Sequence, residues 1–324
     1  MFKVRLWGVR GSIPCPGPDT VTYGGNTICL ELRVGEEDRL LIIDAGSGIR
    51  ALGNYLVAND LPRGPIQTQI FLTHTHWDHI IGFPFFTPIY IPGTKLEIYG
   101  PVSYEDESLE EIIGGQLRYR YFPVRQSELA AEISYHPLKE AVRDLGDGLM
   151  LRTKYLNHPI LDLGYRFEYQ GKVFVTVFDN EPFRNVFDVP KDSPDYDADA
   201  FEEGEAAARE ENEKVLRFME GADLCIYDAQ YTQKEYDDSK VGWGHSSFEW
   251  AINSAYKARV GKIVLIHHDP LRTDAELEQL ETGYRASIER ATQAAASGPS
   301  SSGGDGGRAL PDVVMAREGM ELRL

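Results

Sequence analysis

The segment covering residues 71–79, Phe-Leu-Thr-His-Thr-His-Trp-Asp-His, places three histidines and an aspartate within six residues. Imidazole and carboxylate groups suit zinc, manganese or iron. On an extended segment His74 and His76 point to the same side, because side chains alternate with a period of two, so together they can bind one metal ion. Asp78 and His79 follow where the chain must turn, and they can reach a second ion. One segment cannot complete two coordination spheres, so the pattern predicts further ligands from other parts of the chain.

The further candidates follow apolar segments that we interpret as buried strands. His158 follows residues 149–156, Asp179 follows residues 173–178, and His267 and His268 follow residues 263–266. Since α/β proteins generally place their sites at strand ends, we expect these side chains to converge at one edge of the sheets. A lone histidine after a strand is usually structural, but the set as a whole predicts a metal site.

Short apolar segments of strand length make up most of the framework that must position these residues. Strands are predicted at residues 1–6, 28–34, 39–44, 68–73, 95–100, 149–156, 165–169, 172–178, 223–228 and 262–267, with helices at 49–57 and 246–258. This order indicates a layered α/β domain.

Three segments depart from this pattern. Residues 102–135 read as an inserted helical and loop segment, and residues 191–214, with ten acidic and three basic residues, read as a solvated loop or helix start on the surface. Residues 294–308 have the composition of a flexible loop. Because residues 312–324 still read as a closing hairpin, we predict a single domain over residues 1–324.

The composition indicates which substrates and which cell compartment the protein is suited to. The chain has 324 residues, and 51 acidic against 33 basic residues give it a net charge of −18. This charge disfavours a large nucleic acid, whose binding depends on Lys and Arg, but suits a small anionic substrate held by metal ions. The chain has no run of eighteen apolar residues, so no membrane span is predicted. The odd number of cysteines, three, favours a reducing cytoplasm.

The histidine pattern also resembles a known family. His74-x-His76-x-Asp78-His79, with the later candidates, looks like the metallo-β-lactamase superfamily. The segments at residues 7–14, 157–159 and 244–247 are similar to the phosphodiesterase branch, which includes ribonuclease Z and cyclic-phosphate phosphodiesterases. The resemblance implies a four-layer αββα sandwich, and it leaves open a homodimer, since ribonuclease Z-like enzymes often dimerise.

Carried over by position, the resemblance implies two divalent metal ions per chain, zinc or manganese, with iron as a further option. The implied ligands are His74, His76 and His158 for the first ion, Asp78, His79 and His267 for the second, and Asp179 as a bridge between them. The spacing after His245 favours His267 over His268 as the ligand. Asp44 would orient the metal loop through hydrogen bonds.

The resemblance also implies catalytic roles. His245 would donate a proton to the leaving group, with Asp228 as its carboxylate partner, and Asp78 of the metal motif is counted with them as a catalytic residue. Ribonuclease Z has His-Glu-Ala-Thr where this chain has Tyr227-Asp228-Ala229-Gln230. The plainer interpretation of His245 is a helix-start histidine satisfied by the backbone.

Candidate substrate contacts are more speculative. Phe83 and the rings beside it could stack a base, although core packing is the more common use of such a run. Arg118 and Arg120 could hold a phosphate, or they could belong to a plain surface helix. The remaining two candidates are Asn26 in the first loops and His268 beside the metal ligand.

The leading hypothesis is therefore a dinuclear metal-dependent phosphodiesterase that hydrolyses a small phosphodiester, above all a cyclic nucleotide. The second hypothesis is a ribonuclease Z-like RNA 3′-processing endonuclease, but the chain has no basic Gly/Pro-rich arm of the kind that clamps tRNA. An acyl or thioester hydrolase and a non-catalytic metal-binding protein are the third and fourth hypotheses. The sequence identifies neither the metal, nor the phosphodiester, nor the oligomeric state.

Overall fold

The computed structural model describes residues 1–102, 107–297 and 310–324, and within them it forms two seven-stranded sheets. The first sheet has the order β14-β1-β2-β3-β4-β5-β6. Its strands are β1 (Phe2–Gly8), β2 (Cys29–Val34), β3 (Arg39–Ile43), β4 (Gln67–Phe71), β5 (Lys95–Pro101), β6 (Glu132–Leu138) and β14 (Glu321–Arg323).

The second sheet has the order β13-β12-β11-β10-β9-β8-β7. Its strands are β7 (Val142–Asp144), β8 (Met150–Tyr155), β9 (Leu163–Tyr169), β10 (Lys172–Val177), β11 (Leu224–Asp228), β12 (Lys262–Ile266) and β13 (Asp312–Met315). Strands β11 and β12 lie between parallel neighbours and are apolar almost throughout, as expected for strands covered on both faces.

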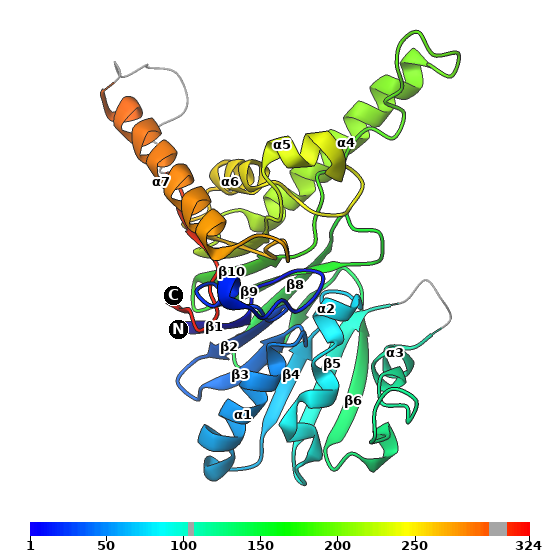
Figure 1. The fold of residues 1–324 in the computed structure, drawn as a ribbon, viewed down its shortest axis with the longest axis vertical. Coiled ribbons are helices and arrows are strands. Elements are labelled where there is room, and N and C mark those ends of the chain that lie inside the picture. The colour runs from blue at the N-terminus through cyan, green and yellow to red at the C-terminus, as the bar shows by residue number, and fades with distance from the viewer. Residues whose placement is uncertain (103–106, 298–309) are drawn as a thin grey trace.

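Helices cover the outer face of each sheet (Figure 1). On the first sheet these are α1 (Ile49–Asn59), α2 (Trp77–Ile80) and α3 (Leu109–Gly115), and on the second α4 (Ala198–Met219), α6 (Phe248–Lys257) and α7 (Asp274–Ser297). A short helix, α5 (Gln233–Glu235), runs directly into a π-helical turn at Tyr236–Lys240.

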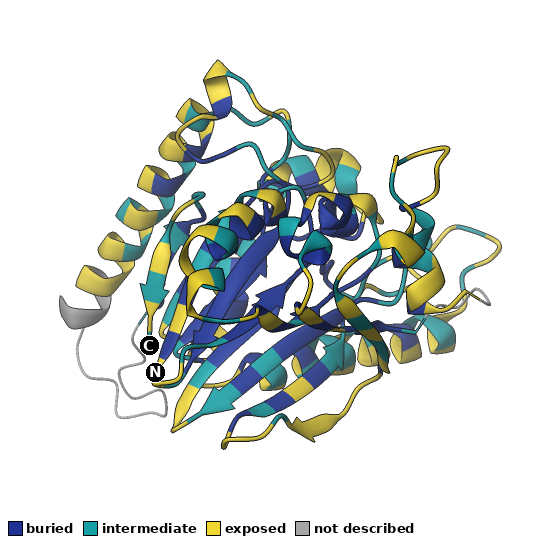
Figure 2. Cartoon of the chain, turned by 90° about the horizontal axis from the view of Figure 1, so that it is seen from below, coloured by how far each residue is buried: buried dark blue, intermediate teal, exposed yellow. Residues whose placement is uncertain are grey.

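The buried side chains form three clusters that separate these layers. The first joins the two sheets and includes Leu30 and Phe167; the second and third lie between each sheet and its own helices. Figure 2 shows the buried strands at the centre and exposed residues on the outer sides of the helices. Helix, sheet, sheet and helix are therefore stacked in that order, and the predicted four-layer αββα sandwich is confirmed.

The strand directions bring the candidate site residues to one edge. Strands β3, β4 and β5 are parallel to one another, and so are β10, β11 and β12. The carboxyl ends of each set therefore lie along one edge of its sheet. Asp44 and His74 follow β3 and β4, while Asp179 and His267 follow β10 and β12.

The structure differs from the sequence prediction in three segments. Residues 132–138, partly assigned to the insertion, form β6, which pairs in parallel with β5. The acidic segment 191–214 contains most of α4, which begins after the capping side chain of Asp197. The helix α7 was not predicted, and it includes the first four residues of the expected flexible loop at 294–308; the rest of that loop lies outside the described residues.

None of the helices within residues 1–102, 107–297 and 310–324 is long and apolar enough to cross a membrane.

Candidate metal centre

Three of the site residues have a backbone conformation that side chains rarely adopt. Asp44, Asp179 and His267 each follow a strand closely and have φ angles of 60°, 47° and 66°. A left-handed conformation at a residue other than glycine costs about 1–3 kcal/mol and is found mainly at functional sites. The chain therefore turns sharply at the ends of β3, β10 and β12, where side chains must be aimed at one point.

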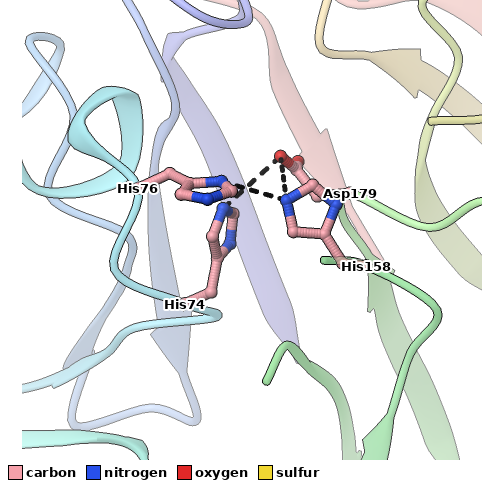
Figure 3. Close-up of side chains that lie close together, drawn as sticks. All are labelled: His74, His76, His158 and Asp179. Carbon is pink, nitrogen blue, oxygen red and sulfur yellow. Dashed lines mark hydrogen bonds and ion pairs between the residues drawn. The ribbon is translucent and has the colours of Figure 1, made fainter. Parts of the chain in front are cut away.

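The first group of potential ligands consists of His74, His76, His158 and Asp179, whose ligand atoms lie within 4.8 Å of one another. Figure 3 shows the three imidazoles and the carboxylate turned toward a common centre. His158 Nε2 lies 3.0 Å from His76 Nδ1. His74 Nε2 and His158 Nε2 lie 3.5 Å and 3.9 Å from Asp179 Oδ2.

The second group consists of Asp78, His79, Asp179 and His267. His267 Nε2 lies 3.2 Å from Asp78 Oδ2 and 3.3 Å from Asp179 Oδ1. His79 Nε2 lies 3.3 Å from Asp179 Oδ2. Asp179 is thus common to both groups: its Oδ2 faces His74, His158 and His79, and its Oδ1 faces His267.

The far side of three of the imidazoles is held by a hydrogen-bond or ion-pair partner. His79 Nδ1 lies 2.8 Å from Asp44 Oδ2, and His74 Nδ1 lies 3.0 Å from Asp162 Oδ2. His158 Nδ1 lies 3.0 Å from the carbonyl oxygen of Gly244. A partner on Nδ1 fixes the ring and leaves Nε2 for a metal ion. This is the place that the sequence analysis gave to Asp44.

The unsatisfied atoms of the site fit a divalent metal ion. Nε2 of His74, Nε2 of His79 and Oδ1 of Asp179 are buried without a hydrogen-bond partner among the described residues. Buried polar atoms nearly always have a partner, and three such atoms turned toward one another fit a bound cation. Imidazole nitrogens with bridging carboxylates are a donor set that suits zinc, manganese or iron.

Burial and charge act in opposite directions on the titrating groups. Burial lowers the pKa of His74 well below its ordinary value and that of His158 to about 4, so both rings stay neutral, the form that binds a metal. Burial opposes charge on His267 too, but Asp179 and Asp78 raise its pKa to about 9. For Asp179, burial is outweighed by His267, His79 and His74, which lower its pKa well below the usual range. Asp179, which both ligand groups share, is therefore held in its charged form and attracts positive charge.

The structure also brings His245 and Asp228 together at the edge of this centre. His245 Nδ1 lies 3.1 Å from Asp228 Oδ2, and the rings of His245 and His267 stack with centroids 4.7 Å apart. Asp228 is the last residue of β11 and is fully buried. The backbone N–H groups of Asn180 and Ser246 also donate to Asp228 Oδ2, over 3.2 Å and 3.3 Å.

Two of the predicted substrate contacts are buried in the core. Phe83 is 1% exposed and packs between the first sheet and its helices, so it offers no ring face to a substrate. His268 is fully buried, and its Nε2 donates to the carbonyl oxygen of Ala316 over 2.8 Å. These two expectations are corrected: the side chains hold the fold together. Asn26 is half-buried and its side-chain amide is engaged by Ser47 and Glu318, and its contact with a substrate stays a prediction.

Arg118 and Arg120 are exposed on the segment after α3. They line a groove of about 890 Å³ together with Tyr119 and Arg125, and none of the candidate metal ligands lines it. The structure therefore does not bring these two arginines to the metal centre.

Two buried carboxylates that the sequence analysis missed also contribute to the site. Asp162 contacts His74, as described above, and Glu181 accepts hydrogen bonds from the loop that carries His245. Their only signal in the sequence is their closeness to His158 and Asp179 along the chain.

Comparisons with known proteins agree with this geometry. Residues 23–154 match the family described as "Metallo-beta-lactamase superfamily". The ribonuclease Z of Lactococcus lactis subsp. lactis is 26% identical over 271 residues, which cover 75% of this chain and 83% of the relative. The ribonuclease Z of Exiguobacterium sibiricum is 28% identical over 249 residues, covering 68% and 77%.

Solved structures share the fold. Unliganded yeast PDE1 superposes with a TM-score of 0.61 at 15% identity, over 100% of this chain and 99% of the other. The short form of human tRNase Z gives a TM-score of 0.57 at 18% identity, over 99% and 98%.

Proposed function

Because the chain carries a metallo-beta-lactamase domain and is a metal-dependent hydrolase with ribonuclease Z relatives, we propose that it is a dinuclear phosphodiesterase. The observation that carries the proposal is the pair His245 and Asp228, in contact over 3.1 Å beside two ligand groups that share Asp179. A carboxylate-held histidine next to a metal pair suits a reaction whose leaving oxygen needs a proton.

The ligand groups would hold two metal ions, one among His74, His76 and His158 and the other among Asp78, His79 and His267, with Asp179 between them. When bound, such a pair supplies a nucleophilic hydroxide at neutral pH and positive charge for the phosphate oxygens. The chain fixes the ligands through Asp44, Asp162 and the carbonyl oxygen of Gly244, so little rearrangement is needed when substrate binds.

His245 would act on the leaving group. Asp228 Oδ2 lies 3.1 Å from His245 Nδ1, so this carboxylate would fix the orientation of the imidazole through that nitrogen. The opposite nitrogen, Nε2, can then give a proton to the departing alkoxide. General acid catalysis of this kind is worth about 10²- to 10⁴-fold in rate.

For the substrate, we propose a small phosphodiester, with a cyclic nucleotide as the first candidate. The support is electrostatic. The chain carries a net charge of −18, and residues 191–214 contain ten acidic against three basic residues. Much of this segment lies in α4, which extends outward from the second sheet (Figure 1), so the part that reaches farthest into solvent would repel a polyanion.

The second candidate is RNA 3′-end processing, and the ribonuclease Z relatives favour it. The chemistry would be the same, and only the substrate would differ. An acidic surface far from the centre does not prevent a short single-stranded end from entering.

The deciding experiment compares substrates on the same metal-loaded protein. The protein would be stripped with a chelator and reloaded with zinc or manganese, then given bis(p-nitrophenyl) phosphate, cyclic nucleotides, a precursor tRNA and a thioester. Metal-dependent turnover of the diesters supports the proposal, and the ratio of kcat/KM for cyclic nucleotide and tRNA selects the candidate. Turnover of the thioester alone, with two ions bound, would refute phosphodiesterase activity.

A further inference from the structure

The loop that carries His245 has little regular structure of its own. It begins with the π-helical turn Tyr236–Lys240 and continues through Gly242 and Gly244, whose φ angles are 85° and 84°. π-Helical turns are rare and occur frequently at functional sites. Because a loop with two left-handed glycines lacks a repeating hydrogen-bond pattern, its position must be fixed by contacts from outside.

Those contacts converge on the carboxylate of Glu181, a residue that is 5% exposed. Glu181 Oε1 accepts hydrogen bonds from the hydroxyl of Tyr236 and the N–H of Gly242, both over 2.7 Å. Glu181 Oε2 accepts a hydrogen bond from the N–H of Gly244 over 2.8 Å. One buried carboxylate therefore holds both ends of the loop through three charge-assisted hydrogen bonds.

The same carboxylate is tied to the metal-binding side of the site. Glu181 lies two residues after Asp179, and its N–H donates to the carbonyl oxygen of Asn157, the residue before His158. Gly244 packs so closely on His158 that a Cβ atom at position 244 would lie 2.4 Å from His158 Nδ1. Glu181 thus fixes the position of the loop relative to the candidate metal ligands Asp179 and His158.

His245 is the residue after Gly244, whose N–H donates to Glu181. If Gly244 moves, the His245 imidazole loses its alignment with Asp228, which is fixed at the end of β11. A general acid must lie within hydrogen-bond reach of the oxygen that it protonates, so a shift of about 1 Å is enough to impair it.

We infer that Glu181 is a positioning residue for His245: its hydrogen bonds hold the loop Tyr236–Gly244 against the metal-ligand loops, so that the imidazole lies within reach of the leaving group. The inference rests on the proposed phosphodiesterase function and assigns a part in it to a residue outside the ligand set.

The test uses the metal-loaded Glu181→Gln variant and two substrates. The p-nitrophenolate of bis(p-nitrophenyl) phosphate leaves without a proton, whereas the sugar alkoxide of a cyclic nucleotide needs one. We expect kcat for the cyclic nucleotide to fall at least ~10-fold, up to the ~10²- to 10⁴-fold that general acid catalysis supplies, and kcat for the activated diester to change by less than about 3-fold. Metal content should stay that of the wild type.

Two further variants sharpen the comparison. Glu235→Gln is the matched control, because Glu235 begins the same loop but pairs with Arg272 and the N–H of Thr232. It should behave as the wild type on both substrates. Tyr236→Phe removes one of the three hydrogen bonds to Glu181 and should give a smaller loss with the same substrate selectivity, which keeps the test available if Glu181→Gln does not fold.

The imidazole resonances of His245, assigned with a His245→Asn variant, provide a readout that is independent of turnover. We expect their chemical shifts to change in Glu181→Gln. An equal loss on both substrates together with lost metal, or wild-type behaviour in both assays, would overturn the inference. If the wild type hydrolyses neither diester, the phosphodiesterase proposal fails, and the resonances alone decide whether Glu181 positions His245.

Discussion

Replacing Asp44 by asparagine should weaken one metal site and spare the other. Asp44 is fully buried and accepts three hydrogen bonds: Oδ1 from the N–H of Thr73 over 2.7 Å, and Oδ2 from the hydroxyl of Thr73 over 2.9 Å and from His79 Nδ1 over 2.8 Å. An amide has only one oxygen. Because the backbone N–H of Thr73 is always a donor, the amide oxygen must face it, and the amide NH₂ must face His79.

This orientation of the amide changes the tautomer of His79. An NH₂ group that donates to His79 Nδ1 moves the ring proton to Nε2, the nitrogen that is turned toward Asp78 and Asp179 and would bind the metal. Losing the hydrogen-bond partner of a ligating histidine typically lowers metal affinity about 10- to 100-fold. That range corresponds to about 1.4–2.7 kcal/mol in binding free energy.

The assay is a competition titration with a chromophoric chelator, which should resolve two binding steps in the wild type. We expect one step to weaken about 10- to 100-fold in Asp44→Asn, and the other, held by His74, His76 and His158, to change less than about 3-fold. Asp38→Asn is the control, since Asp38 pairs with Lys3 at the surface. Unchanged affinity at both steps, or equal weakening at both in a folded protein, would refute the reasoning.

Three further predictions follow from the same geometry. Asp228→Asn should lower kcat for a cyclic nucleotide about 10²- to 10⁴-fold and spare bis(p-nitrophenyl) phosphate, and equal losses would contradict the role of His245 as the acid. Gly11→Ala should reduce metal content, measured by atomic emission, because a Cβ there would lie 2.3 Å from the ring of His267, whereas Gly17→Ala, with open space around it, should not. Burial lowers the pKa of His268 to about 3, below the ordinary 6.5, so the folded state resists protonation. Stability from this group is complete above about pH 6.5 and falls as the pH drops toward 3, by about 2 kcal/mol at pH 5. Urea unfolding of His268→Gln at pH 7 and pH 5 should show a smaller difference than the wild type, and an equal difference would refute the assignment.

The ligand groups could be predicted from the sequence because their signal is local. His74, His76, Asp78 and His79 are close in the chain, and Asp179 and His267 follow apolar runs that are recognisable as strands. The sheet edge then brings them together, since parallel strands end on the same side. The four-layer sandwich followed from the same runs and from the resemblance.

Contacts that depend on tertiary structure could not be predicted in this way. Phe83 and His268 lie near metal ligands along the chain but point into the core, because closeness in sequence does not determine which way a side chain points after a turn. Asp162 and Glu181 are single carboxylates in loops, where no periodicity marks burial. Strand β6, Glu-Ile-Ser-Tyr-His-Pro-Leu, lies at the edge of its sheet and has only Leu138 buried, so it lacks the apolar run of an internal strand.

The charge of the site explains how an acidic protein could bind an anionic phosphate. Five carboxylates surround the centre: Asp44, Asp78, Asp162, Asp179 and Asp228. Among the ion pairs of the described residues, these carboxylates pair with histidines and with no lysine or arginine. These carboxylates would repel an anionic phosphodiester unless bound metal ions outweigh their charge. Substrate affinity should therefore depend on metal occupancy, while changes to distant surface charge should alter mainly the rate of encounter and its dependence on salt.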